Sequence, residues 1–498
     1  MYSRRLGFGA STAAAQPPRE TVREPVNPEE FRQAGHRVID WIADYRARAA
    51  DLPVMSRVAP GEVRAQLPAI PPEHGELFDA ILADLDRVIV PGLSHWQHPR
   101  FFGYFPSNAT LASVLGDLVS SGLGVLGLSW QSSPALTELE ETVADWMRRM
   151  VGLSDAWSGV IQDSASSSTL VALLCARERA TDHGQTRGGL QAEPRPLTVY
   201  TSVQGHSSVE KDALLAGFGR DNLRAVPTDR DHALDPAALD EAIRQDRRAG
   251  KLPCAIVATV GTTATTALDP LLPLADLARE HDMWLHVDAA LAGSAMILPD
   301  CRWMWEGIEG ADSLVLNPHK WLGTVFDCSL YYVRDPQHLI RVMSTNPSYL
   351  RSAADDRVQN LRDWGIPLGR RFRALKLWFL IREQGIEGLQ ARLRRDLANA
   401  KWLAGQVDAT PDWRRLAPVP LQTVCVRHVP PGLEGEALDT HTLEWAARVN
   451  ASGAAYLTPA LLEGRWMVRV SIGAEPTELR HVQDLWQLMR ETAEGPLS

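Results

Sequence analysis

Short apolar stretches alternate with helical patterns from about residue 132 onward, and this alternation limits the possible folds more than any other feature of the chain. Strands that are joined through helices run parallel, and the helices then cover both faces of the sheet. We therefore predict an α/β core built on a mainly parallel sheet. The expected strands cover residues 159–162, 197–202, 254–260, 284–287, 313–316 and 329–333. Helical patterns separate most of them, for example at residues 137–150, 167–179 and 270–281.

The segments on either side of this core have a different pattern. An amphipathic helix is predicted to begin after Asn27, a good N-cap, with Pro28 at its first position. A second helical pattern covers residues 77–90, and this front section is too small to bury its own apolar faces. After about residue 370 the order of elements predicts a smaller α+β domain. Its expected elements are helices at 372–384 and 386–406, a strand at 424–429 and helices near Glu444 and Glu478.

Size, charge and cysteine content exclude several classes of protein. A chain of 498 residues is longer than one hydrophobic core usually organises, so more than one domain is expected. The net charge of -10 and the lack of a long basic run argue against a nucleic-acid partner. No apolar run reaches the roughly 18 residues that a membrane span needs. The five scattered cysteines lack metal-ligand spacing, so we expect reduced thiols, no metal site and a cytoplasmic location.

A lysine and an aspartate follow two of the expected strands. Lys320 lies in the segment NPHKW just after the strand at 313–316, and Asp288 lies in HVDAA at the end of the strand at 284–287. An enzyme that uses pyridoxal phosphate (PLP) needs such a pair, because the lysine forms the Schiff base and the carboxylate keeps the pyridine nitrogen protonated. Either residue alone would most often be an ordinary surface lysine or strand-terminal aspartate. The prediction therefore depends on their combination.

Further polar residues lie at strand ends, where open α/β sheets bind their ligands. The serine-rich run at 164–168 follows the strand at 159–162 and opens a helix, which suits a phosphate, although such runs more often only cap helices. His206 could stack on a flat ring, and the small Ala290 would leave room for that ring. Thr263, in the turn ATVGTT, could donate a further hydrogen bond. Ordinary capping or turn roles are the alternatives for His206 and Thr263.

The chain resembles the group II PLP-dependent amino-acid decarboxylases, and most closely the aromatic-L-amino-acid decarboxylase branch. The resemblance covers about residue 26 to the end, and it rests on many short segments that occur in the family's order. These segments are HWQHPRFFGYFP (95–106), SWQSSPALTELE (129–140), IQDSASSSTLVALL (161–174), GHSSVEK (205–211), ATVGTT (258–263), HVDAA (286–290), NPHKW (317–321), NPSYL (346–350) and IPLGRRFRALKLW (366–378).

This resemblance implies a role for each matching residue. Lys320 would be the Schiff-base lysine, Asp288 would hold the pyridine nitrogen, and His206 would stack on the ring opposite Ala290. Tyr349 would lie on a loop that closes over the substrate and would return a proton to Cα after CO2 leaves. The other expected cofactor contacts are Ala165, Ser166, Thr263, Asn317 and His319. The expected substrate contacts are Trp96, Tyr104, Phe105, Pro106, Leu128 and His319.

The resemblance also implies a fold and an assembly. The fold would be the aspartate-aminotransferase-like type I fold, and the protein would be a homodimer whose subunits share the active sites. In the predicted division, residues 1–25 form a disordered tail and residues 26–110 an N-terminal helical dimerisation segment. Residues 111–378 would form the large PLP-binding domain, and residues 379–498 a small C-terminal α+β domain.

The implied activity is decarboxylation of an aromatic or bulky apolar L-amino acid to the amine and CO2. In aldehyde synthases of the same family, the loop tyrosine is replaced by phenylalanine or the ring-stacking histidine by asparagine. Because Tyr349 and His206 are both present, the sequence favours the amine. Decarboxylation-dependent oxidative deamination to an aldehyde is the first alternative. An aminotransferase and a catalytically silent scaffold are the others.

Three positions depart from the family pattern. Leu291 and Leu128 stand where the family usually has aromatic residues, so the sequence does not fix dopa, tyrosine or tryptophan as the substrate. The aromatic wall disfavours glutamate, whereas the nearby Arg100 leaves an acidic substrate open. Asp163 replaces a common glycine and brings a negative charge toward the expected phosphate loop unless it points to solvent.

Overall fold

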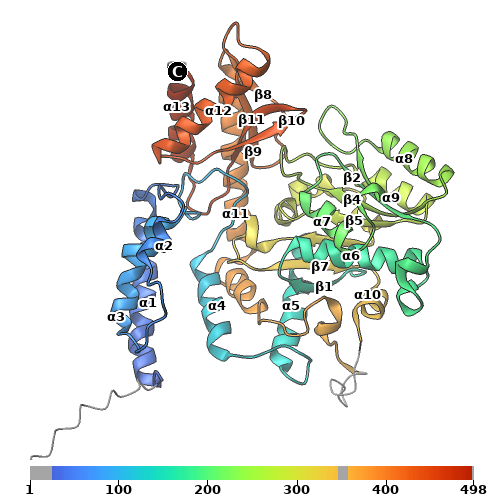
Figure 1. Ribbon diagram of the computed structural model, residues 1–498, viewed down its shortest axis with the longest axis horizontal. Helices are drawn as coiled ribbons and strands as arrows, with labels where there is room; N and C mark the ends of the chain where they lie inside the picture. The colour runs from blue at the N-terminus through green and yellow to red at the C-terminus, as the bar shows by residue number, and fades with distance from the viewer. Residues whose placement is uncertain (1–24, 346–356, 496–498) are drawn as a thin grey trace, which may run out of the picture. The chain divides into compact units, whose positions relative to one another are not determined.

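The computed structural model describes residues 25–345 and 357–495, and the chain divides into two compact units (Figure 1). The first unit contains the described residues up to Arg48 together with Ser56–Ser94. The second contains Ala49–Met55 and the chain from His95 onward. No described helix is both long enough and apolar enough to cross a membrane.

In the first unit, hydrogen bonds and ion pairs between side chains connect the helices. Helix α1 (Pro28–Arg48) begins where the sequence predicts, because the side chain of Asn27 accepts hydrogen bonds from the N–H groups of residues 29 and 30, both at 3.0 Å. Trp41 of α1 donates to Asp86 at 2.9 Å, and Arg48 also pairs with Asp86. No residue of α1 is buried: Phe31 is exposed, whereas Val38, Trp41 and Ile42 are half-buried. The shorter helices are α2 (Glu62–Gln66) and α3 (Phe78–Asp84).

The second unit contains a seven-stranded sheet with the strand order β1-β7-β6-β5-β4-β2-β3. Only β7 runs against its neighbours, which confirms the predicted mainly parallel sheet. The strands are β1 (Ser158–Gln162), β2 (Leu197–Ser202), β3 (Leu223–Val226), β4 (Leu252–Thr259), β5 (Trp284–Asp288), β6 (Ser313–Leu316) and β7 (Ser329–Val333). The sequence missed β3, because its four residues include a charged arginine and form no long apolar run.

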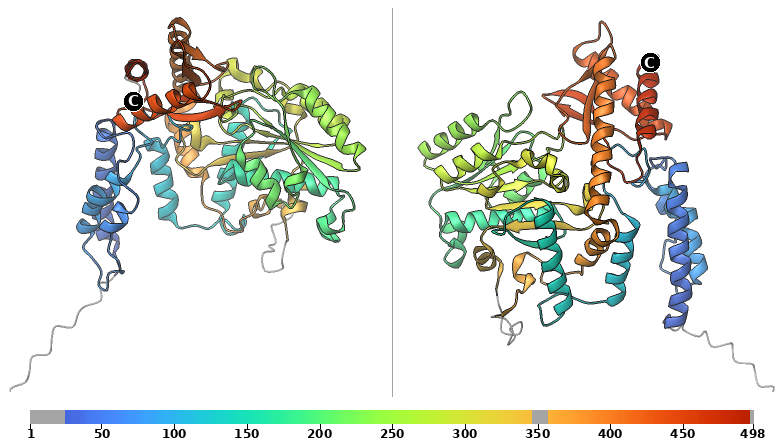
Figure 2. Two further views of the ribbon diagram at one scale, coloured as in Figure 1. Left: turned by 45° about the horizontal axis from the view of Figure 1, so that its top comes forward. Right: turned by 180° about the vertical axis from the view of Figure 1, so that it is seen from behind.

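Helices cover both faces of this sheet (Figure 2). Side chains of alternate strand residues enter two separate cores, as Tyr332 and Tyr331 illustrate. One core receives α5 (Pro134–Met150), α8 (Pro236–Arg248) and α9 (Leu271–Glu280). The other receives α6 (Ala165–Ala180), α7 (Ser207–Leu215) and α10 (Pro336–Met343). Helix α4 (Leu111–Leu123) instead leaves Leu111, Leu115, Leu118 and Leu123 exposed, and we call these four residues the α4 stripe.

A smaller antiparallel sheet, in the order β10-β11-β9-β8, has its own core with α12 (Gly435–Ser452) and α13 (Leu479–Ala493). Its strands are β8 (Trp413–Arg415), β9 (Thr423–His428), β10 (Thr458–Leu462) and β11 (Arg465–Ser471). The two helices expected at 372–384 and 386–406 are joined as α11 (Ala374–Ala409), which is kinked at Gly385, where φ is 64°. The domain boundaries expected at residues 110 and 378 stay predictions.

A buried ion pair fixes the C-terminal end of β1. Glu140 of α5 is 1% exposed, and it pairs with Arg370, which is 8% exposed. The N–H of Ile161 donates to Glu140 at 2.8 Å, while Arg370 donates to the carbonyl of Ile161 at 2.6 Å. The pair therefore holds both backbone polar groups of a residue next to the end of β1.

We expect Glu140→Ala to lower the free energy of unfolding by about 3–5 kcal/mol, because it leaves the buried Arg370 without its counter-ion. The measurement is the thermal unfolding midpoint of the purified protein. Arg248→Ala is the matched control, since it breaks a surface ion pair with Glu241, in which the side chains are 64% and 55% exposed, and should cost far less. Equal shifts for the two variants would contradict the assigned role of Glu140.

Candidate active site

Two adjoining cavities lie at the ends of the central strands. The large cavity has a volume of about 640 Å³ and the small cavity one of about 220 Å³. Five residues line both cavities, so they form one continuous site. These shared residues are Phe105, His206, Thr263, His319 and Lys320.

The small cavity brings together the lysine and the aspartate that the sequence singles out. Asp288 is the last residue of β5, and Lys320 lies in the single helical turn that follows β6, the neighbouring parallel strand. Both side chains line the cavity. The N–H of Ala290 donates to Asp288 Oδ1 at 2.9 Å, which fixes the orientation of the carboxylate. The structure thus provides an amine and a carboxylate at one cavity.

The surroundings of Lys320 favour its neutral form. Burial lowers the pKa of its ammonium, and the positive charge of Arg469 acts in the same direction, whereas Asp288 opposes the shift. The Nζ atom lies 5.5 Å from the centre of the Phe105 ring. A larger neutral fraction makes the amine a better nucleophile near neutral pH.

Two histidines at the site are also held neutral. Burial lowers the pKa of His206, whose Nδ1 accepts the backbone N–H of Ser208 at 3.1 Å. Burial lowers the pKa of His319 to about 4, and its Nδ1 accepts the N–H of Cys328 at 3.0 Å. With Nδ1 as the acceptor, the proton of each neutral ring lies on Nε2. Each imidazole therefore has an Nε2–H that can donate a hydrogen bond.

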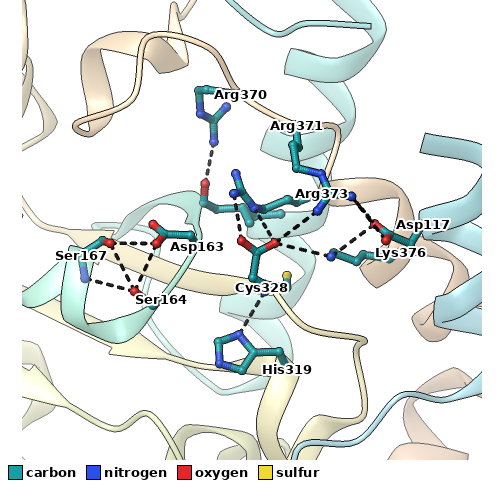
Figure 3. A network of polar contacts seen from close by, with 12 residues as sticks. Asp117, Asp163, Ser164, Ser167, His319, Cys328, Arg370, Arg371, Arg373 and Lys376 are labelled. Atoms are coloured by element: carbon teal, nitrogen blue, oxygen red, sulfur yellow. Dashed lines mark hydrogen bonds and ion pairs between the residues drawn. The ribbon is translucent and has the colours of Figure 1, made fainter. Parts of the chain in front are cut away.

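The first turn of α6 forms one end of the small cavity, and the N–H groups of a helix N-terminus can bind an anion. Ala165 and Ser166 begin this helix and line the cavity, and Ser164 caps it by accepting the N–H of Ser167 at 3.3 Å. Asp163 accepts the hydroxyl groups of Ser164 at 3.3 Å and Ser167 at 3.0 Å (Figure 3). Asp163, which stands where a glycine is common, is thus held by the hydroxyl groups of these two serines.

A network of charges holds the chain around residue 327 beside His319. Arg373 donates two hydrogen bonds to Asp327, at 3.1 and 3.0 Å. Lys376 is 0% exposed, and its Nζ lies 3.3 Å from Asp117 and 3.7 Å from Asp327. Figure 3 shows Lys376 and Arg373 in this network near His319 and Cys328. Sequence reasoning missed the network, because its members come from three distant segments.

Aromatic residues line the large cavity as the sequence predicts. Trp96 and Tyr104 stack with ring centres 5.5 Å apart, and Phe105 and Pro106 continue the same wall. Within the part of the chain that the structure describes, Leu128 lines neither cavity, and Leu291 lines the small one. Tyr349 lies outside the described residues. Lining residues of the large cavity that were not predicted as site residues are Ser107, Val203, Gln204, Gly205, Ser207, Ala264, Phe326, Thr458, Ala460 and Arg469.

The lining of the small cavity fits PLP. Lys320 supplies an amine for the aldehyde carbon, Asp288 a carboxylate for the ring nitrogen, and the start of α6 a site for the phosphate. Thr259 also lines this cavity, and its buried Oγ1 has no hydrogen-bond partner among the described residues. A bound polar molecule would satisfy this hydroxyl. Asn317 is fixed by the hydroxyl of Ser329, which donates to it at 2.7 Å.

Comparison with known proteins agrees with this geometry. Residues 60–429 match the model of the pyridoxal-dependent decarboxylase conserved domain. Phenylacetaldehyde synthase of Arabidopsis thaliana is 40% identical over 95% of this chain and 97% of its own length. Tryptophan decarboxylase 2 of Oryza sativa subsp. japonica is 40% identical over 94% of this chain and 95% of its own. The crystal structure of Oryza sativa TDC with PLP and tryptamine has a TM-score of 0.92 and 37% identity, and covers 95% of this chain and 99% of that one.

We expect Lys320→Ala to abolish covalent attachment of PLP, because it removes the only lysine among the residues lining the small cavity. The measurement is incubation with PLP, reduction with borohydride, and mass spectrometry of the peptides. Lys211→Ala, which removes an exposed lysine of α7, is the control and should retain the adduct. An undiminished adduct in Lys320→Ala would exclude Lys320 as the attachment site.

Proposed function

This chain belongs to the family of pyridoxal-dependent decarboxylases, and from that premise we propose that it converts an aromatic L-amino acid into the amine and CO2. The observation that carries the proposal is the placement of Lys320 and Asp288 on one small cavity that opens into an aromatic-walled one. A relative that is 40% identical is a tryptophan decarboxylase, and others at 39% are tyrosine decarboxylases.

The cofactor and the protein divide the chemistry between them. Bound PLP supplies a ring that accepts the electron pair left at Cα when CO2 departs. Lys320 would hold the cofactor through its neutral amine and release it to the amino group of the substrate. Asp288 would keep the pyridine nitrogen protonated through a charge-assisted hydrogen bond. His206 and Ala290 would contact the two ring faces.

Protonation at Cα decides the product. We assign this proton transfer to Tyr349, as the family resemblance implies, and general-acid catalysis of this kind typically contributes about 100- to 10,000-fold. A phenylalanine in place of Tyr349, or an asparagine in place of His206, would favour oxidation by O2 instead. The 40% identical phenylacetaldehyde synthase makes the aldehyde the second candidate. The presence of both Tyr349 and His206 supports the amine.

The large cavity supports an aromatic side chain in the substrate. Trp96, Tyr104 and Phe105 offer ring faces and edges against which another aromatic ring packs favourably. Within the described residues, Arg100 does not line this cavity, so its charge gives no support to an acidic side chain. The wall selects the class of substrate without selecting among tryptophan, tyrosine and dopa.

We also infer a homodimer in the cytoplasm. The α4 stripe and the exposed apolar residues of α1, such as Phe31 at 64% exposure, would be covered by a second subunit. The five cysteines are all buried and free, which supports a reducing compartment. The proposal involves no nucleic acid and no membrane partner.

We expect the purified protein with PLP to release CO2 and amine from aromatic L-amino acids and from few others. The measurement is a panel of L-amino acids with product masses and CO2 determined together. Glutamate should give no amine, because the large cavity offers its side chain an aromatic wall. Lack of CO2 release from every aromatic amino acid would refute the proposed function.

We expect Tyr349→Phe to divert product from amine to aldehyde, with O2 consumed and CO2, ammonia and hydrogen peroxide formed. The reason is that the proton for Cα is no longer available. Tyr104→Phe is the matched control, because it removes another phenol of the site without removing the proposed acid. An unchanged amine yield in Tyr349→Phe would remove Tyr349 from this role.

A further inference from the structure

Asp163 stands directly before the helix start that we assign to the phosphate of PLP. It follows Gln162, the last residue of β1, and precedes Ser164, the N-cap of α6. Ser164 lines the small cavity together with Ala165 and Ser166. Within the described chain, Asp163 lines neither of the two cavities of the site and lines instead a third cavity of about 80 Å³. The carboxylate therefore lies just behind the phosphate end of the small cavity.

Asp163 competes with a bound phosphate for the hydroxyl proton of Ser164. Its Oδ2 atom accepts the hydroxyl of Ser164 at 3.3 Å and that of Ser167 at 3.0 Å (Figure 3). The oxygen of Ser164 also accepts the N–H of Ser167 at 3.3 Å and lies 3.2 Å from the hydroxyl oxygen of Ser167. Because a serine hydroxyl has a single proton, Ser164 can donate to an anion in the small cavity only by giving up its bond within this group.

Within the part of the chain that the structure describes, no basic side chain forms an ion pair with the Asp163 carboxylate. Arg373 lines the same third cavity, but it donates two hydrogen bonds to Asp327. Arg370 lines that cavity as well and is paired with Glu140. A phosphate at the start of α6 therefore meets a negative charge behind the helix turn, and like charges repel.

We propose that Asp163 weakens the binding of the PLP phosphate and thereby makes the cofactor exchangeable. Asp163 acts through Ser164 and through its own charge, so it is a positioning residue and not a catalytic one. The inference rests on the proposed function, which assigns PLP to the small cavity, and adds a residue that regulates its loading. The N–H groups of the first turn of α6 remain available to the phosphate. The site still binds PLP, and the loaded fraction follows the PLP concentration.

Two other roles for Asp163 predict different results. Its two bonds to serines could serve only to brace the first turn of α6, and their loss would then affect every ligand of the small cavity alike. Asp163 could instead hold this turn in the conformation that binds phosphate best, and its loss would then weaken PLP. The sign of the change and its dependence on the phosphate therefore separate the three roles.

The test compares three probes of the small cavity after bound cofactor has been removed. PLP has the ring and the phosphate, pyridoxal has the ring without the phosphate, and inorganic phosphate has no ring. The dissociation constants of PLP and pyridoxal are measured by absorbance titration, and that of inorganic phosphate by its competition with PLP. The proteins are the wild type, Asp163→Asn and Asp163→Ala.

Asp235→Asn is the matched control. Asp235 is another half-buried aspartate at the start of a helix, where it accepts the N–H groups of Ala237 at 2.8 Å and Ala238 at 3.3 Å. In the described chain it lines neither the small nor the large cavity. Because asparagine is also a good N-cap, this variant should fold and bind all three probes as the wild type does.

We expect Asp163→Asn to tighten the binding of PLP and inorganic phosphate about 3- to 10-fold, as gain of one hydrogen bond does, and that of pyridoxal less than about 2-fold. Pyridoxal has no phosphate for Asp163 to oppose. Equal changes for all three probes would assign Asp163 to the brace and overturn the proposal. Weaker binding of PLP would assign it to holding the turn, and this result or the absence of any change would overturn the proposal as well.

Asp163→Ala covers the case in which Asp163→Asn fails to fold, because it removes the charge together with both acceptor oxygens. It should tighten PLP relative to pyridoxal, and an unchanged ratio of the two dissociation constants would overturn the proposal. The outcome is separable from the proposed function. The expected affinities without decarboxylation of any amino acid would refute only the function, whereas a decarboxylase in which Asp163→Asn leaves the ratio unchanged would refute only the role of Asp163.

Discussion

The parallel pairing of β5 with β6 is the constraint on which the site depends. Asp288 lies opposite Val315, so both strands end at the same edge of the sheet, and the chain turns there into the segment that bears Lys320. A slip of one residue in this register would direct the Asp288 side chain to the other face. The amine and the carboxylate therefore meet through backbone pairing and not through a contact of their own. The ends of β2 and β1, each one strand further out in the sheet, then add His206 and the first turn of α6.

Buried basic side chains fall into two groups that differ in their partners. Arg370 is paired with Glu140, and Lys376 lies between Asp117 and Asp327, so these charges stabilise the framework behind the cavities. Lys320 and Arg469 line the large cavity, and within the described chain neither has an ion pair. Leaving a buried charge unpaired costs free energy, which ligands can recover when they bind. The contrast separates side chains that hold the fold from those placed for ligands.

Sequence patterns predicted the features that depend on a short stretch of the chain. Lys320, Asp288 and the serine run each follow an apolar strand, and parallel strands bring their ends together, so the small cavity could be anticipated. Arg469 could not be placed, because the direction in which a strand residue points depends on the sheet and its neighbours. Its occurrence within the apolar run MVRVS was the available signal. Leu128 was assigned to the substrate from resemblance alone, and in the described chain it lines neither cavity.

Helix α11 affects how the molecule unfolds, because it packs into two separate cores. Its first half contributes Leu377 and Leu389 to the core of the central sheet, and its second half contributes Leu403 and Val407 to the core of the small sheet. An element shared by two cores makes their local opening cooperative, because fraying of one removes packing from the other. Arg469 and Lys320 come from these two sheets. Correlated motion of the sheets would keep these two basic side chains at a constant spacing while either sheet fluctuates.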